Sequence, residues 1–216
     1  MKLIIGGMKV CNKHFVVIDN ELFNMKYGAE SILLISVIQK NLLVRGTYVF
    51  NLNYIYDNLN IDGNNTRQKN KIKNCLVKLQ KGSIITSDIN INNANNNQLI
   101  FVDIKIPKDN YTIVYDVELD TIINYNQGNI YNLYNLFVFL KYRIGIKGYC
   151  YWNQDDIANA IGLKSRKAVS KMIDVLSDDL KLIKVDNIGV RLFNNGNIKE
   201  SNNIYVLNIF IPQLIL

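Results

Sequence analysis

Apolar residues recur at helical spacing in the last third of the chain, most clearly within residues 152–185. Ile157, Ala158 and Ile161 predict a short amphipathic helix that starts after an Asn cap. Gly162 follows it, and glycine is typical of the position just after a helix. A second apolar pattern and then a short apolar run complete the stretch. We therefore predict helix, tight turn, helix and strand.

The second helix of this stretch has one apolar face and one basic face. Val169, Met172, Ile173 and Leu176 form the apolar face. The other face and the residues before it carry the donors that a recognition helix uses on phosphates and base edges. These candidate DNA-binding residues are Lys164, Ser165, Arg166, Lys167, Ser170 and Lys171. The pattern predicts a helix-turn-helix with a wing; the alternative is an ordinary helical pair with a solvated basic face.

A weaker copy of this pattern precedes it. We expect helices over residues 29–42, 53–59 and 66–79 and strands over residues 46–52, 83–90 and 99–106. Gly46 matches Gly148 at an offset of 102, and beyond the turn Ile72 matches Val169 at an offset of 97. Each copy would have to bury its own helical face. Chance matching of apolar positions is the alternative explanation.

The only break between the copies is the stretch that begins at Pro107. We predict an α+β fold of two tandem winged helix-turn-helix domains, residues 1–108 and 109–216. In the second domain, a strand over 111–117 and a helix over 129–142 precede the helix-turn-helix. Further strands are expected near the N-terminus, at 3–5 and 15–18, and near the C-terminus, where 182–185 would pair with 188–193 and another strand would cover 203–211.

Net charge is +7, and its location is more informative than its total. Residues 64–82 contain six Lys and Arg residues and no acid, which is the electrostatic footprint of a nucleic-acid binder. The predicted helix over 66–79 lies in this stretch. Its candidate base-reading residues are Arg67, Gln68, Asn70, Lys71 and Asn74. Its candidate phosphate contacts are Lys69, Lys73 and Lys78, and Arg191 is a candidate in the second wing.

Known catalytic and metal-binding patterns are missing from the sequence. There is no P-loop, the three cysteines are widely spaced, and His14 is the only histidine. Adjacent acids such as Asp155 and Asp156 point apart on a helix. We expect a protein that is not an enzyme, without metal or cofactor and with no evident small-molecule ligand. No apolar run is long enough to span a bilayer, so we expect a cytoplasmic location.

Two winged helices, each opened by a long helix, resemble the tandem winged-helix replication initiators of plasmids and mobile elements. The resemblance covers most of the chain after residue 29 and is one of pattern, without a diagnostic motif. It implies binding to repeated duplex sites at an origin and interchange between dimer and monomer. Primosomal initiation proteins are less similar, because their helical C-terminal half does not match the helix-turn-helix here.

The leading hypothesis is sequence-specific binding of double-stranded DNA, with replication initiation on a plasmid or mobile element as its use. A winged-helix transcriptional regulator is one alternative. A non-enzymatic protein-interaction scaffold is another, because winged helices also serve as interaction modules. A homodimer is left open by the sequence.

Overall fold

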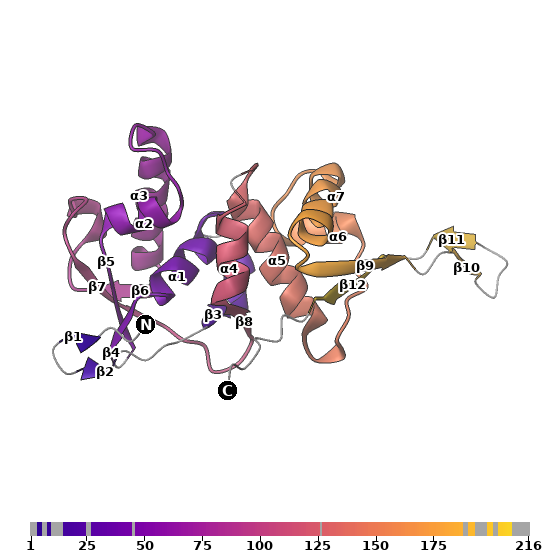
Figure 1. Cartoon of the computed structure of the whole chain (residues 1–216), viewed down its shortest axis with the longest axis horizontal. Helices are drawn as coiled ribbons and strands as arrows, with labels where there is room; N and C mark the ends of the chain where they lie inside the picture. The colour runs from indigo at the N-terminus through magenta and orange to yellow at the C-terminus, as the bar shows by residue number, and fades with distance from the viewer. Residues whose placement is uncertain are drawn as a thin grey trace. The chain divides into compact units, whose positions relative to one another are not determined.

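The computed structural model describes residues 4–5, 8–9, 15–24, 27–44, 46–125, 127–187, 190–192, 198–200 and 203–208. These residues hold seven α-helices and several short strands, and every described strand pair is antiparallel (Figure 1). The fold is α+β, as predicted. Contacts divide the chain into two compact units, Met1–Asn135 and Leu136–Leu216. This division differs from the domain boundary expected after residue 108, which remains a prediction.

The first unit contains most of the regular structure. Its helices are α1 (Ser31–Gln39), α2 (Leu52–Asn58), α3 (Thr66–Lys81) and α4 (Asp116–Ile123), and α5 (Ile130–Ile144) begins in it. Its strands are β1 (Ile4–Ile5), β2 (Met8–Lys9), β3 (Phe15–Asp19), β4 (Leu42–Val44), β5 (Thr47–Phe50), β6 (Ile85–Ser87), β7 (Ile100–Ile104) and β8 (Tyr111–Tyr115).

A four-stranded sheet in the order β4-β5-β7-β6 lies next to these helices. In its central pair, Tyr48 lies opposite Val102 and Phe50 opposite Ile100, and all four are buried. Alternation of buried and exposed residues along β7 places one face of the sheet in the core. Strands β3 and β8 form a separate ribbon.

Helix α1 is buried on every side, although its sequence predicts only one broad apolar face. All nine of its residues are buried. Its polar side chains therefore need internal partners. Ser36 Oγ lies 2.7 Å from the hydroxyl oxygen of Tyr134, and Gln39 bonds both the N–H and the carbonyl of Val17 in β3, at 2.9 and 2.6 Å. These bonds tie the central helix to the ribbon and to the start of α5.

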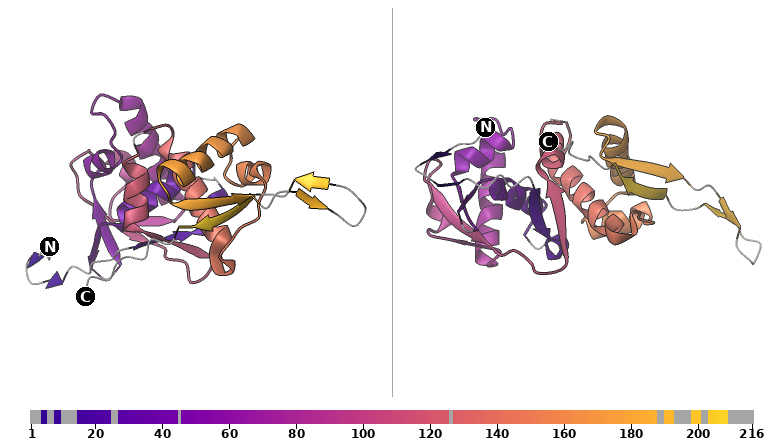
Figure 2. Two further views of the ribbon diagram at one scale, coloured as in Figure 1. Left: turned by 45° about the vertical axis from the view of Figure 1, so that its right-hand side comes forward. Right: turned by 60° about the horizontal axis from the view of Figure 1, so that its bottom comes forward.

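The second unit contains the rest of α5, two further α-helices and two antiparallel strand pairs. Its elements are α6 (Gln154–Ala160), α7 (Arg166–Asp174) with a π-helical turn at Val175–Asp179, β9 (Ile183–Asn187), β10 (Val190–Leu192), β11 (Ile198–Glu200) and β12 (Asn203–Leu207). Strand β9 pairs with β12, and Cys150 bridges to Tyr205 on β12. Figure 2 shows this strand pair from two further directions.

One predicted strand pairing is wrong. The apolar run 182–185 does not pair with 188–193, because β9 pairs with β12 and β10 pairs with β11. Pairing with β12 places Ile183 opposite Leu207 and Val185 opposite the buried Tyr205. Several predictions fall on residues outside the described part of the chain: those concerning residue 3, Cys11, His14, residues 188, 189 and 193, and residues 209–211.

One order of elements occurs twice along the chain. It runs α1, β5, α2, α3, β6, β7 and then α5, Cys150, α6, α7, β9, β12, with β10 and β11 inserted between the last two. The last strand of each set pairs with both other extended segments, β7 with β5 and β6 and β12 with Cys150 and β9. The predicted offset of 102 holds at the helix starts. Asn51 Oδ1 accepts from the Tyr54 N–H at 2.7 Å, and Asn153 Oδ1 accepts from the Asp156 N–H at 2.8 Å. Both asparagines are N-caps.

The turns after α2 and α6 repeat at the same offset. Asn60 and Gly162 have φ values of 51° and 70°. Asparagine and glycine are the residues that best tolerate this left-handed conformation. The next residue in each turn donates to a carbonyl five residues back: Ile61 to Tyr56 at 2.9 Å and Leu163 to Ala158 at 2.8 Å. The turn between α2 and α3 and the turn between α6 and α7 therefore share their backbone hydrogen bonding.

The inward faces of α3 and α7 also correspond. At the predicted offset of 97, the matched residues are all at least 97% buried: Ile72 with Val169, Leu76 with Ile173 and Leu79 with Leu176. The apolar positions that the sequence matched are therefore core positions in both helices.

Candidate nucleic-acid interface

Helix α3 is the most basic element of the described chain and presents one face to solvent. Asn65 caps it by accepting from the Gln68 N–H at 3.0 Å. Its first turn carries Arg67 and no acid, so a cation adds to the positive end of the helix dipole. That placement disfavours the helix and favours an anion near its start.

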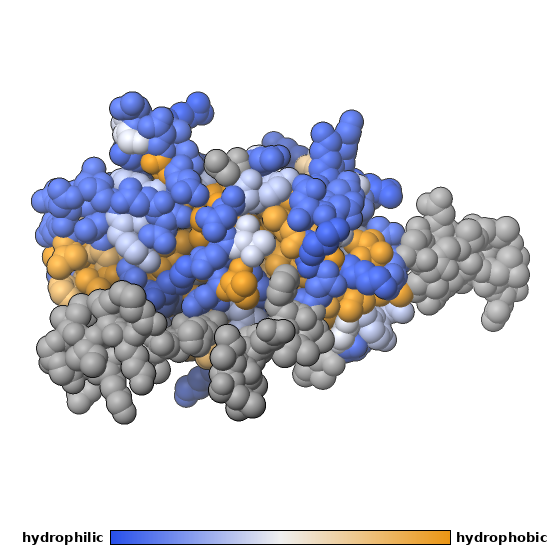
Figure 3. Space-filling model, in the orientation of Figure 1, coloured by the Kyte–Doolittle hydropathy of each residue, from blue (hydrophilic) through white to orange (hydrophobic). Residues whose placement is uncertain are grey.

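The outward face of α3 forms a continuous polar stripe, which we call the α3 stripe. Its members are exposed and follow one another at intervals of three and four residues, so they share one side of the helix. They are Arg67, Asn70, Asn74, Lys78 and Lys81. Hydrophilic residues, blue in Figure 3, cover α3 and the turn before it. The stripe contains three of the predicted base-reading residues and two further lysines of the basic stretch.

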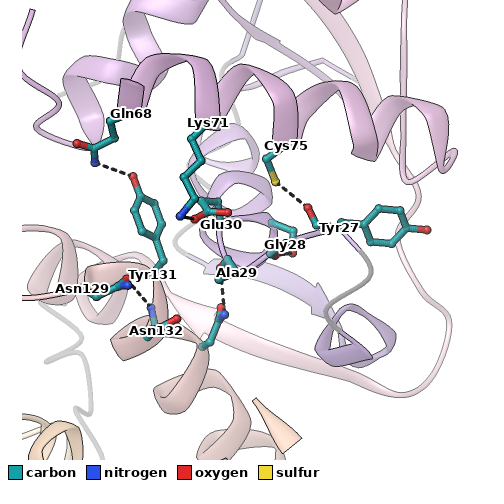
Figure 4. A network of polar contacts seen from close by, with 12 residues as sticks. Tyr27, Gly28, Ala29, Glu30, Gln68, Lys71, Cys75, Asn129, Tyr131 and Asn132 are labelled. Atoms are coloured by element: carbon teal, nitrogen blue, oxygen red, sulfur yellow. Dashed lines mark hydrogen bonds and ion pairs between the residues drawn. The ribbon is translucent and has the colours of Figure 1, made fainter. Parts of the chain in front are cut away.

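Two predicted base-reading residues of α3 point to a different side. Gln68 Nε2 donates to the Tyr131 hydroxyl at 3.1 Å, and Lys71 forms an ion pair with Glu30, whose side chain is 5% exposed. Figure 4 shows both side chains directed at the segment before α1 and the start of α5. Internal contacts therefore occupy both of these side chains.

Lys69 and Lys73, predicted phosphate contacts, lie beside the stripe and bond nearby backbone. Lys69 Nζ donates to the Gly63 carbonyl at 2.8 Å and lies 5.2 Å from the centre of the Tyr56 ring. Lys73 Nζ donates to the Ala94 carbonyl at 2.8 Å. These lysines brace the turn before α3 and the loop between β6 and β7.

The Asn-rich loop between β6 and β7 folds back on α2. Asn53 at the start of α2 donates from its backbone to Asn96 at 3.1 Å and from its side chain to Asn97 at 2.6 Å. The side chain of Asn95 accepts from two N–H groups of the same loop. Much of the asparagine content thus stabilises the loop itself.

The corresponding residues of α7 are more exposed. Lys164, Ser165, Arg166, Lys167 and Lys171 are exposed and Ser170 is half-buried. Ser165 occupies the N-cap position, but its side chain makes no capping bond. Arg166 Nε lies 3.5 Å from Gln154 Oε1 on α6. Arg191 belongs to β10, and its side chain lies outside the described residues.

An aromatic cluster before α6 was not predicted from the sequence. The Arg143 guanidinium lies 4.3 Å from the centre of the Trp152 ring, and Phe139 packs edge-on against the same ring at 5.3 Å. These contacts fix the residue just before the Asn153 cap, and hence the start of α6. Tyr149 and Tyr151 remain exposed on the neighbouring segment.

A pocket of about 570 Å³ adjoins α3 in the first unit. Its walls come from the end of α2, the first two turns of α3, the end of α4 and the start of α5: Leu59, Asn60, Asn65, Arg67, Gln68, Lys71, Ile123, Gly128, Asn129, Ile130 and Tyr131. Burial raises the pKa of the Tyr131 hydroxyl, while its bond from Gln68 lowers it and the nearby Glu30 charge raises it. The pocket was not predicted from the sequence.

Comparisons of the chain with protein-family models, with curated proteins and with solved structures found no match. Among the described helices, none is long and apolar enough to cross a membrane.

Proposed function

We propose that this protein is a sequence-specific double-stranded DNA-binding protein with two winged helix-turn-helix units, without enzymatic activity, and that it acts as a replication initiator of a plasmid or mobile element. The observation that carries the proposal is the α3 stripe. It combines cations for phosphates with two exposed asparagines on a helix whose opposite face is buried. The repeated element order supports a second, similar unit that begins at α5.

Within the stripe, residue chemistry separates two tasks. Asn70 and Asn74 carry amides that can bond adenine bidentately, and Arg67 can bond guanine. Lys78 and Lys81, nearer the end of the helix, suit phosphate oxygens. On α7, Arg166, Lys167 and Lys171 supply the corresponding cations. Specificity would therefore depend on the first half of α3, and non-specific affinity on its second half.

The deciding experiment compares binding of the purified chain to random duplex DNA and to duplexes with repeated candidate-origin sites, at two salt concentrations. Lys78→Gln should weaken binding to both duplexes and reduce the log–log salt slope by about 0.9, since one phosphate contact is lost. Asn74→Ala should weaken only specific binding, by about 1–3 kcal/mol. Lys105→Gln, an exposed site outside α3, provides the charge-matched control.

Three results would count against the proposal in different ways. Absence of salt-sensitive binding to either duplex would favour the hypothesis of a protein-interaction scaffold over DNA binding. Equal effects of Lys78→Gln and Lys105→Gln would remove α3 from the interface. Specific binding to promoter-like sites without preference for repeated origin sites would favour a transcriptional regulator. The pocket beside α3 supports this second candidate, because a regulator needs a site for an effector.

A further inference from the structure

The pocket beside α3, named here the α3–α5 pocket, is large enough for a ligand and lies within the first unit. Its volume of about 570 Å³ falls in the range of small-molecule sites. Its apolar lining residues are Leu59, Ile123 and Ile130, and Arg67, Gln68 and Lys71 of α3 contribute polar side chains. Concave sites with a mostly apolar wall and a few convergent polar groups are typical of ligand binding.

The electrostatics of the α3–α5 pocket favour an anion. None of its lining residues is acidic. Helices α3 and α5 both start at the pocket, and each is long enough for its N-terminal dipole to matter. Glu30 offsets the charge of Lys71, whereas Arg67 has no ion-pair partner among the described residues. Arg67 therefore supplies an uncompensated cation beside two positive helix ends.

A buried hydroxyl adds a directional donor. Tyr131 is 7% exposed and lines the pocket. Its oxygen accepts from the side-chain amide of Gln68 (Figure 4). The side-chain oxygen of Gln68 in turn accepts from the Asn65 amide, which fixes the orientation of the Gln68 amide. The proton of the Tyr131 hydroxyl has no acceptor among the described residues. This hydroxyl is therefore available to donate to a ligand oxygen in the pocket.

We propose that the α3–α5 pocket binds a phosphate group. A phosphate has three features that match the lining residues: negative charge, several acceptor oxygens and a geometry that Arg67 can bond bidentately. The apolar lining residues leave room for an attached planar or aliphatic body, as in a mononucleotide. The same phosphate chemistry could come from a free ligand or from the backbone of bound DNA, and the two sources are distinguished below. The free-ligand case does not depend on the proposed function.

The first arm of the test uses equilibrium dialysis of the full chain with orthophosphate, AMP and adenosine. Orthophosphate and AMP should each bind the wild type and Lys105→Gln with equal affinity, and adenosine should bind more weakly than AMP. Arg67→Gln should lower the affinity for both phosphate probes by about tenfold. Lys105→Gln removes the same charge from an exposed site outside the pocket. Circular dichroism spectra matching the wild type would show that Arg67→Gln is folded.

The second arm uses duplexes in which one backbone phosphate at a time is a neutral methylphosphonate. If the free probes do not bind, a methylphosphonate at one position should weaken DNA binding by the wild type but not by Arg67→Gln. That result would assign the pocket to a DNA phosphate. Failure of both arms, or equal losses in Arg67→Gln and Lys105→Gln, overturns the phosphate site. If the wild type binds no duplex at all, the proposed function fails, and dialysis alone decides the pocket.

Discussion

The Lys71 ammonium on α3 forms an ion pair with the carboxylate of Glu30, the residue just before α1. The carboxylate side chain is 5% exposed, whereas the lysine side chain is 61% exposed, so the pair joins a buried acid to a largely solvated base. Sequence reasoning assigns Lys71 to DNA because it lies in an acid-free run. In the folded chain its charge compensates an acid 41 positions away.

Removal of Lys71 should therefore affect stability. Lys71→Gln leaves the buried Glu30 carboxylate without a counter-charge, and we expect a loss of about 1–3 kcal/mol in the free energy of unfolding. Urea denaturation followed by circular dichroism measures this loss. The double variant Glu30→Gln with Lys71→Gln should recover most of the loss, because no charge is then buried. A wild-type urea midpoint for Lys71→Gln alone would show that the pair is not a stabilising contact.

The two asparagine caps should contribute similarly in the two units. Asn51→Ala and Asn153→Ala each remove the acceptor for an N–H in a first helical turn, and each should cost about 1 kcal/mol. Asn51→Asp keeps an acceptor and should retain most of the stability. Asn153→Asp also keeps an acceptor but replaces the amide that donates to Asp156 with a second carboxylate, so it should retain less. Thermal unfolding of the four variants measures this. If the alanine and aspartate variants have the same unfolding temperature, the side-chain hydrogen bonds are not the source of the stability difference.

Gly82, the residue after α3, lies under an aromatic ring. A Cβ added there would lie 2.3 Å from Cε1 of Tyr27, so Gly82→Ala must displace that ring. We expect a loss of about 1 kcal/mol, the lower end of the cost of overpacking, since a ring edge can move.

Gly63 gives the matched control for this substitution. A Cβ at Gly63 meets nothing within 4 Å, so Gly63→Ala should leave the urea midpoint unchanged. Equal midpoints for the two alanine variants would mean that Tyr27 does not constrain the end of α3.

The two described thiols should be unreactive in the folded chain. Burial raises the pKa of Cys75 to about 12, with the Glu30 charge adding to the effect, and burial raises the pKa of Cys150 to about 11. At pH 8 both are almost entirely protonated, and only the thiolate reacts with iodoacetamide.

Peptide mass spectrometry after alkylation at pH 8 should find Cys75 and Cys150 modified only when urea is present. Because the folded pKa values exceed those of the unfolded chain, the thiols favour folding below about pH 8.5, and this contribution is lost as pH rises towards 11 and 12. Rapid alkylation of Cys75 without urea would contradict its burial.

Local sequence determined the positions of several helices closely. The expected helix over 66–79 is α3, Thr66–Lys81, and the expected helix over 154–161 is α6, Gln154–Ala160. Caps, turn residues and apolar faces act over three to five positions, so their pattern is visible in the sequence itself. The repeat could be found for the same reason, because both copies use the same short-range rules.

Tertiary structure alone decided which strands pair and where the polar side chains of α3 are directed. Strand β9 skips the next strand and pairs with β12, and alternation of apolar residues cannot specify a partner or register across that distance. Likewise, periodicity places Gln68 and Lys71 on α3 but cannot reveal that Tyr131 and Glu30 pack beside them. The sequence determined what each segment forms by itself; long-range packing determined which of its charged and polar groups remain exposed to a partner.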